Sequence, residues 1–144
     1  MAVISSETLH ATTIAIDGRA IVLEGLSGAG KSDLALRLID RGAMLVSDDY
    51  TLLVRSGDLL LARNPGAMAG KLEVRGLGIV ALPHLTDVAV ALVVRLGGEP
   101  LRMPERRVRR IAGVAVREIA LDAFQISAPV KVELALRQPV DARP

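Results

Sequence analysis

The sequence predicts an α/β fold, namely a phosphate-binding-loop (P-loop) domain whose mixed β-sheet is flanked by helices. Several observations predict it. A glycine-rich motif stands between a short apolar run and a segment with helical spacing. Further aliphatic runs along the chain alternate with turn signals. The chain has 144 residues, of which 51% are apolar and 24% charged, and this composition excludes a disordered chain. We expect a single domain over residues 1–144.

The first forty residues indicate a strand, a tight turn, a strand, a loop and a helix. Residues 9–16 are rich in β-branched side chains, and Asp17-Gly18 is a strong hairpin signal before the apolar run at 20–24. Residues 33–41 carry an apolar stripe at helical spacing, and Gly42 supplies a stop.

The next segments also favour strands. Residues 44–47 form a short apolar run, and residues 51–55 and 59–63 flank the turn Ser56-Gly57-Asp58, which predicts an antiparallel hairpin.

The second half of the chain is less uniform. Residues 87–96 are nearly all Val, Ala and Leu, the composition of a strand buried on both faces in the middle of a sheet. Residues 130–137 indicate a helix. Residues 67–75 are ambiguous, and residues 111–121 fit a strand or a short helix equally well.

Residues 25–32 match the phosphate-binding pattern G-x-x-x-x-G-K-[ST] at every fixed position. The glycines let the backbone turn its N–H groups toward a polyphosphate at a helix N-terminus. Lys31 would reach the β- and γ-phosphates, and the Ser32 hydroxyl would ligate Mg²⁺. The alternative is a glycine-rich turn that binds nothing, which the flanking strand and helix disfavour. The predicted nucleotide-binding residues are Gly25, Leu26, Ser27, Gly28, Ala29, Gly30, Lys31 and Ser32.

Two adjacent carboxylates, Asp48 and Asp49, follow the strand predicted at 44–47. Most such pairs are turn residues that bond to their own backbone. Beside a P-loop they have a chemical use, because phosphoryl transfer needs one carboxylate for Mg²⁺ and another for the proton of the attacking hydroxyl. The functional interpretation is therefore favoured.

Other polar residues allow two interpretations. His10 and His84, taken alone, are more typical of structural histidines. Glu73 and Arg75 would point to the same side of an extended segment, either around a metal-bound phosphate or, as we favour, in a pair. The five arginines within residues 102–110 fit a solvated face and a site for a phosphorylated or acidic partner equally well.

Composition excludes several classes of function. The chain has no cysteine, so it has neither a disulfide framework nor a thiolate metal site. A net charge of +2 does not demand nucleic-acid binding, and only two aromatic residues disfavour recognition by base stacking. The N-terminus lacks a signal-peptide pattern, and no apolar stretch is long enough to span a membrane. We expect a soluble, cytoplasmic protein.

Several separated motifs, in order, resemble the catalytic domain of HPr(Ser) kinase/phosphorylase. They are Gly-Leu-Ser-Gly-Ala-Gly-Lys-Ser-Asp-Leu-Ala-Leu at 25–36, Arg-Gly at 41–42, Val-Ser-Asp-Asp at 46–49 and Leu-Glu-Val-Arg-Gly-Leu-Gly-Ile at 72–79. The resemblance is dense over residues 9–80. It implies a fold like that of HPr kinase and phosphoenolpyruvate carboxykinase, with ATP and Mg²⁺ as cofactors.

The resemblance also implies roles for single residues. The implied catalytic set is His10, Lys31, Asp48, Asp49 and Arg102, and the implied Mg²⁺ ligands are Ser32 and Glu73. Lys31 would contact the transferring phosphate, and Asp49 would be the acid/base, supported by Asp48. Arg102 fits best as the expected arginine after the long strand, with positions 106 and 107 as alternatives.

The chain departs from the family pattern at both ends. We expect a form in which no regulatory domain precedes His10 and the C-terminal part is short, similar to the short forms that work beside a sensor kinase. Residues 132–134 read Val-Glu-Leu, where the family shows Gly-Arg-Asn in the segment tied to dephosphorylation. We therefore expect weak phosphorolysis.

The predicted function is an ATP- and Mg²⁺-dependent serine kinase that phosphorylates an HPr-type phosphocarrier protein of a phosphotransferase system. Loop amides and Lys31 would neutralise the phosphates, and Asp49 would take the seryl proton. Two alternatives stay open. One is a nucleotide-binding regulatory module that has lost catalysis, and the other is a P-loop kinase of a small metabolite.

Overall fold

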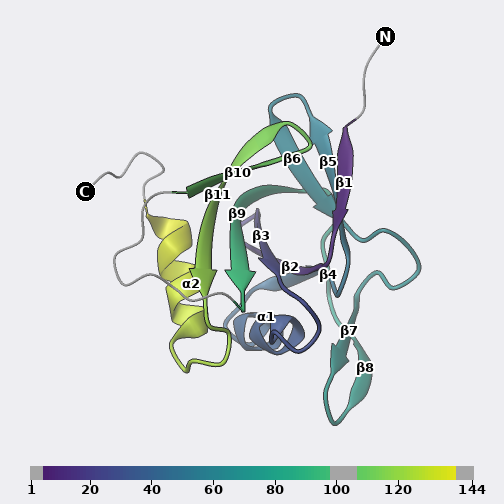
Figure 1. The fold of residues 1–144 in the computed structure, drawn as a ribbon. Helices are drawn as coiled ribbons and strands as arrows, with labels where there is room; N and C mark the ends of the chain where they lie inside the picture. Colours follow the sequence, from purple (N-terminus) through teal and green to yellow (C-terminus); the bar gives the residue numbers. More distant parts are fainter. Residues whose placement is uncertain (1–4, 98–106, 139–144) are drawn as a thin grey trace.

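The computed structural model describes residues 5–97 and 107–138, which form the fold drawn in Figure 1. This part of the chain contains eleven strands and two helices. In chain order they are β1 (Ser6–Leu9), β2 (Ala11–Ile16), β3 (Arg19–Glu24), α1 (Lys31–Asp40), β4 (Met44–Ser47), β5 (Thr51–Ser56), β6 (Leu59–Arg63), β7 (Lys71–Val74), β8 (Gly78–Ala81), β9 (Val88–Leu96), β10 (Arg107–Ile111), β11 (Val114–Leu121) and α2 (Ala128–Arg137).

Nine of the strands form one mixed sheet, as predicted. Its main path is β1-β5-β6-β9-β3-β2-β4, with β11 added to β9 and β10 added to β11. Strand β9 runs parallel to β3 and β11, whereas β2 is antiparallel to both β3 and β4. The first two residues of β9 pair with β6, and its last five pair with β11. The aliphatic strand predicted in the middle of the sheet is therefore confirmed.

Two groups of buried side chains cover the two faces of the central strands. On β9, Leu92 and Val94 pack in the group that contains both helices, whereas Val93 packs in the group that contains β5 and β6 on the other face. Alternate residues of a strand point to opposite faces, so a strand buried on both faces must be apolar throughout. Figure 1 shows α1 and α2 beside the ends of these strands.

Helix α1 follows the glycine-rich loop directly. It begins at Lys31, two residues before the predicted start, and buries Leu34, Ala35 and Leu38. Asp33 and Arg37, one turn apart on this helix, form an ion pair with the Arg37 Nε 3.1 Å from the Asp33 Oδ2. Each described helix has ten residues, and neither is long and apolar enough to cross a bilayer.

Pairing decided the segments that were ambiguous in the sequence. Residues 111–121 contain β11, and residues 67–75 contain β7, which forms a separate hairpin with β8. The predicted helix near the C-terminus is confirmed as α2. Glu73 lies on β7, which ends at Val74, whereas Arg75 lies in the turn after it. The expectation that both residues lie on one extended segment is therefore wrong.

A charged contact joins the two helices. Arg41, just after α1, donates to Glu133 of α2 through Nε (3.0 Å to Oε1) and Nη2 (2.7 Å to Oε1). These hydrogen bonds lower the pKa of the Glu133 carboxyl and raise the pKa of Arg41. A carboxyl whose pKa is lowered by folding adds stability above its unfolded pKa, and that stability is lost as the pH falls through its folded pKa.

We therefore expect Glu133→Gln to lower the melting temperature at neutral pH. The difference from the wild type should shrink in acid, where Glu133 is protonated in both the folded and unfolded wild-type protein. Thermal unfolding followed by circular dichroism across the pH range measures this, with Asp58→Asn in the β5–β6 turn as the control. A difference that is constant with pH would show that the ion pair does not stabilise the fold.

Candidate functional site

The candidate site lies at one edge of the sheet, where four strands end. Because β3 and β4 are each antiparallel to β2, they run in the same direction, and β9 and β11 run parallel to β3. The carboxyl ends of all four meet at one edge, the usual position of ligand sites in open α/β sheets. The glycine-rich loop follows β3, and Asp48 and Asp49 follow β4. His10 precedes β2, which begins at the same edge.

The loop after β3 has the backbone shape that its glycines predicted. Gly28 (φ 87°) and Gly30 (φ 91°) are both left-handed, a conformation that other residues adopt only at a cost. The amide of Ala29 donates to the Leu26 carbonyl (3.0 Å), which closes a turn within the loop. Helix α1 starts immediately after Gly30, so the free N–H groups of its first turn lie at the loop.

Lys31 lies inside this loop. Its side chain is only 6% exposed, and Nζ donates to the Leu26 carbonyl at 3.1 Å. Burial lowers the pKa of Lys31, while the negative charges of Asp49 and Asp48 act to raise it. The loop therefore holds a largely buried cation near two carboxylates, at the position from which the lysine of this pattern reaches the phosphates.

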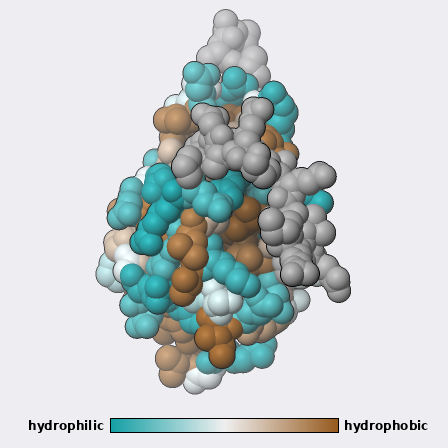
Figure 2. All heavy atoms as spheres, turned by 90° about the vertical axis from the view of Figure 1, so that its left-hand side faces the viewer, coloured by the Kyte–Doolittle hydropathy of each residue, from teal (hydrophilic) through white to brown (hydrophobic). Residues whose placement is uncertain are grey.

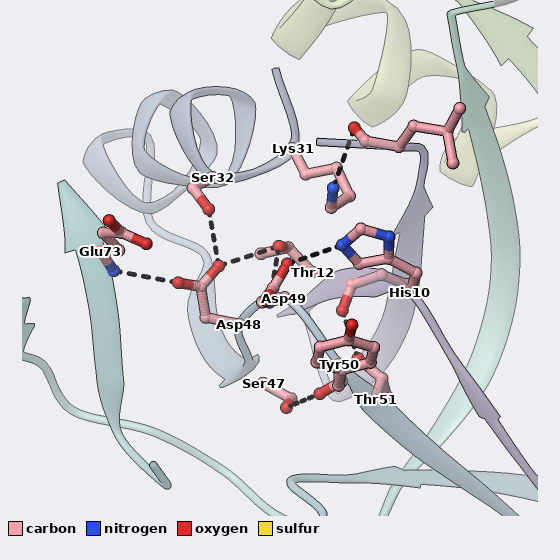
Figure 3. Close-up of polar contacts among 12 residues, drawn as sticks. His10, Thr12, Lys31, Ser32, Ser47, Asp48, Asp49, Tyr50, Thr51 and Glu73 are labelled. Atoms are coloured by element: carbon pink, nitrogen blue, oxygen red, sulfur yellow. Dashed lines mark hydrogen bonds and ion pairs between the residues drawn. The ribbon is translucent and has the colours of Figure 1, made fainter. Parts of the chain in front are cut away.

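Asp48 connects three elements of the fold (Figure 3). Its Oδ1 accepts hydrogen bonds from the Ser32 hydroxyl (2.7 Å) and the Thr12 hydroxyl (2.9 Å). Its Oδ2 accepts from the backbone N–H of Glu73 (3.0 Å). Donors from α1, β2 and β7 thus fix the orientation of this half-buried carboxylate.

Asp49 has a different environment. It adopts a left-handed backbone (φ 66°), and the Tyr50 N–H donates to the Asp48 carbonyl across it (2.7 Å), the pattern of a γ-turn. A strained non-glycine residue persists only when its surroundings hold it, and such residues gather at functional sites. Here the N–H of Asp49 donates to the Thr12 hydroxyl at 3.1 Å. The Asp49 side chain is 58% exposed, so it can meet an incoming molecule.

His10 faces Asp49 from the start of β2. Its Nε2 lies 2.8 Å from the Asp49 Oδ1, and its ring stacks on Tyr50 with 5.0 Å between the ring centroids. An ionised carboxylate only accepts hydrogen bonds, so Nε2 must carry the proton in this contact. The histidine that appeared structural in isolation therefore belongs to the same cluster as the carboxylates.

A cavity of about 320 Å³ opens beside the carboxylates. It lies between Asp48 and Asp49 on one side and the loop from Asn64 to Met68 on the other, with Glu73 on its wall. Asn64 is held by its Nδ2, which donates to the Ser47 hydroxyl at 2.9 Å. The space can admit an acceptor side chain next to the exposed carboxylate of Asp49.

The oxygen groups fit a magnesium ion by their chemistry. Mg²⁺ prefers oxygen ligands, and proteins bind it through one or two carboxylates together with substrate phosphates. Figure 3 shows Glu73 across from Ser32 and Asp48. The three side chains together supply one hydroxyl and two carboxylates. In residues 5–97 and 107–138, no three His, Asp or Glu side chains form a cage that would hold an ion without phosphates.

The structure thus brings most of the predicted residues together. His10, Lys31, Ser32, Asp48, Asp49 and Glu73 share one cluster. Arg102 and Arg106 lie outside the described residues. His84 lies apart from this network, with its Nδ1 3.4 Å from the Leu82 carbonyl and its backbone in an isolated bridge with Leu45.

Two residues contribute to the site in ways that the sequence does not indicate. Thr12 bonds both carboxylate residues, but a threonine in a β-branched strand carries no signal of such a role. Arg109 of β10 forms two hydrogen bonds with Glu24, the residue before the loop, with Nη2 2.9 Å from Oε2. These bonds raise the pKa of Arg109. Within the arginine run, Arg109 contacts the residue before the loop, whereas Arg107 and Arg110 are exposed.

Comparisons with known proteins agree with this geometry. The family model "HPr Serine kinase C-terminal domain" matches residues 2–90. The HPr kinase/phosphorylase of Burkholderia lata is 35% identical over 92% of this chain and 46% of its own length. That of Clostridium tetani is 33% identical over 90% of this chain and 42% of its own length. The chain therefore spans about half the length of these curated relatives.

A solved structure is similar across nearly the whole fold. The HPr(Ser) kinase/phosphatase from Coxiella burnetii superposes with a TM-score of 0.78 at 27% sequence identity. The match covers 91% of this chain and 88% of that one. The α/β fold with a mixed sheet and flanking helices is thus shared with a solved kinase structure.

Proposed function

Because the chain belongs to the HPr serine kinase C-terminal domain family, we propose that it phosphorylates a serine of an HPr-type phosphocarrier protein, with ATP as donor. One observation carries this proposal. The P-loop lysine, the Ser32 hydroxyl and the Asp48–Asp49 pair form one cluster beside a cavity that is open to an acceptor. A structural turn would not need a desolvated lysine and an exposed carboxylate in one place.

In this proposal, the glycine-rich loop binds the phosphates of ATP. Its inward N–H groups and Lys31 offset their negative charge in a partly desolvated site, where such interactions are stronger than in water. Ser32 and Glu73 are the proposed Mg²⁺ ligands, with Asp48 beside them. When bound, Mg²⁺ supplies further neutralisation of the phosphate oxygens.

Asp49 is the proposed general base. The seryl oxygen forms a bond to the γ-phosphorus as the bond to the β,γ-bridging oxygen breaks, the seryl proton passes to the Asp49 carboxylate, and ADP leaves. Asp49 is better placed for this step than Asp48, since both oxygens of Asp48 already accept hydrogen bonds from the protein. His10 contacts one oxygen of Asp49, and Asp49 itself lines the cavity.

The remaining parts of the proposal rest on the resemblance to the family. We propose that residues 1–144 act as one catalytic domain in the cytoplasm, with an HPr-type carrier as substrate. A link to a sensor-kinase system and the role of Arg102 stay predictions.

A transfer assay tests the proposed function. The protein is incubated with Mg²⁺, ATP labelled at the γ-phosphate and an HPr-type carrier, with a carrier whose acceptor serine is alanine as the control. We expect label in the first carrier alone. ATP binding without any transfer would instead favour the regulatory module, and label only in a small molecule would favour the metabolite kinase.

The reverse reaction should be slow. In phosphorolysis, inorganic phosphate attacks the seryl phosphate, the P–O bond to serine breaks, and pyrophosphate leaves. The segment at 132–134 lacks the arginine and glycine expected for binding this phosphate, and Glu133 is engaged with Arg41. We expect pyrophosphate release from the phosphorylated carrier to be slow relative to forward transfer, measured with the same enzyme. Comparable rates would show that this segment is dispensable.

A further inference from the structure

We propose that Phe124 forms a stacking subsite for the base of the bound nucleotide, an inference that rests on the proposed nucleotide-dependent function. Phe124 lies in the loop of residues 122–127, between β11 and α2. It is one of two aromatic residues in the chain, and it is 68% exposed. A large aromatic ring exposed to water beside a phosphate-binding loop offers a flat apolar surface to a base.

The ring of Phe124 lies against the last glycine of the phosphate-binding loop. A β-carbon placed on Gly30 would lie 3.3 Å from Cε1 and Cζ of this ring and 3.0 Å from Cβ of Ala123. The two loops meet because β11, β9 and β3 are parallel, so their carboxyl ends share one edge. The aromatic face therefore begins where the phosphate-binding backbone ends.

The position of Phe124 matches the direction in which a bound nucleotide must extend. The carboxylates that meet the terminal phosphate, Asp48 and Asp49, follow β4 on one side of the P-loop. The loop of residues 122–127 follows β11 on the other side, and Figure 1 shows it across α1 from β4 and β7. With the γ-phosphate at Asp49, the nucleoside points toward the Phe124 side.

The loop of residues 122–127 is held in place. Arg37 of α1 donates to the Gln125 carbonyl (3.2 Å) and to the Ala123 carbonyl, and the Phe124 N–H donates to the Asp122 Oδ1 (2.9 Å). Ala123, the residue before Phe124, is buried. A fixed backbone reduces the conformational entropy lost when a base stacks on the ring. Because every base has a π-face, such stacking accepts more than one base.

The scarcity of aromatic residues pointed away from base stacking when only composition was considered. The structure changes this interpretation, since one ring at the right position is enough for one base.

Exposed apolar side chains also occur further along α2, among them Leu134 at 55% exposure. Figure 2 shows hydrophobic patches on the face that contains α2. Leu134 lies at the far end of that helix from the loop and provides a matched control.

The test compares two ligands that share a diphosphate and differ in the nucleoside. Binding of Mg²⁺ with ADP, and of Mg²⁺ with pyrophosphate, is measured by calorimetry for the wild type and for Phe124→Ala, Phe124→Tyr and Leu134→Ala. If the base stacks on Phe124, Phe124→Ala weakens the binding of ADP at least about fivefold and leaves the binding of pyrophosphate unchanged. Phe124→Tyr and Leu134→Ala should bind both ligands like the wild type.

Other outcomes overturn the inference. Equal weakening of both ligands by Phe124→Ala would mean that the ring only supports Gly30, and an unchanged ADP affinity would mean that no base stacks there. Failure of the proposed function has a separate signature. In that case, the wild type binds neither ligand, or Lys31→Met leaves the affinity for both ligands unaltered. Either result would also overturn the proposed base subsite.

Discussion

Asp49→Asn is expected to lower kcat for carrier phosphorylation by at least about two orders of magnitude, because a positioned general base contributes roughly 10² to 10⁴ in rate. Asparagine has nearly the size of aspartate but cannot accept the seryl proton. It also tolerates the left-handed backbone of this position, so the turn after β4 should survive. ATP affinity should stay within a few-fold of the wild type, as measured by steady-state kinetics and direct binding.

Asp48→Asn is the matched control within the same pair. Asp48 accepts hydrogen bonds from Ser32, Thr12 and the Glu73 N–H, and an amide NH₂ would face one of these donors. We expect this variant to shift the Mg²⁺ dependence more than the proton-transfer step. An Asp49→Asn enzyme with nearly normal kcat would contradict the role of Asp49 as base.

Lys31→Met is expected to weaken ATP binding at least about tenfold, since hydrogen bonds to charged groups contribute about 1.5 to 3 kcal/mol. Transfer should fall further, on the order of 10²-fold or more, because the lysine also offsets charge that develops on the phosphates. Methionine keeps much of the side-chain volume without the charge. Isothermal titration and the transfer assay measure the two effects, with Lys131→Met of α2 as the control.

The fold should survive the Lys31→Met change. Lys31 is only 6% exposed, although it lies at the end of the loop that follows β3. Burial lowers the pKa of Lys31, so the charged lysine in the folded protein costs stability at every pH below its folded pKa. The melting temperature of Lys31→Met should therefore match or exceed that of the wild type. Normal carrier phosphorylation by this variant would remove the P-loop from the mechanism.

Local sequence was sufficient for the features that depend on neighbouring residues. The glycine spacing, the apolar strand before it and the stripe of α1 all arise within residues 20–42, and the structure has them as predicted. The β5–β6 hairpin follows in the same way from its turn residues. The composition of β9 predicted its burial, because only a strand covered on both faces tolerates apolar residues throughout.

Only the tertiary structure decided what depends on distant residues. Parts of residues 67–75 and 111–121 form strands because a partner strand satisfies their backbone, a choice that local preference does not make. Asp48 and Asp49 look alike in the sequence. Their environments differ through contacts with Thr12, 36 or 37 residues earlier, and with His10, 39 residues earlier. Likewise, Phe124 reaches Gly30 only because parallel strands end at one edge. Periodicity and turn chemistry act within a few residues, whereas such contacts depend on sheet order and register, which are set by packing of the whole chain.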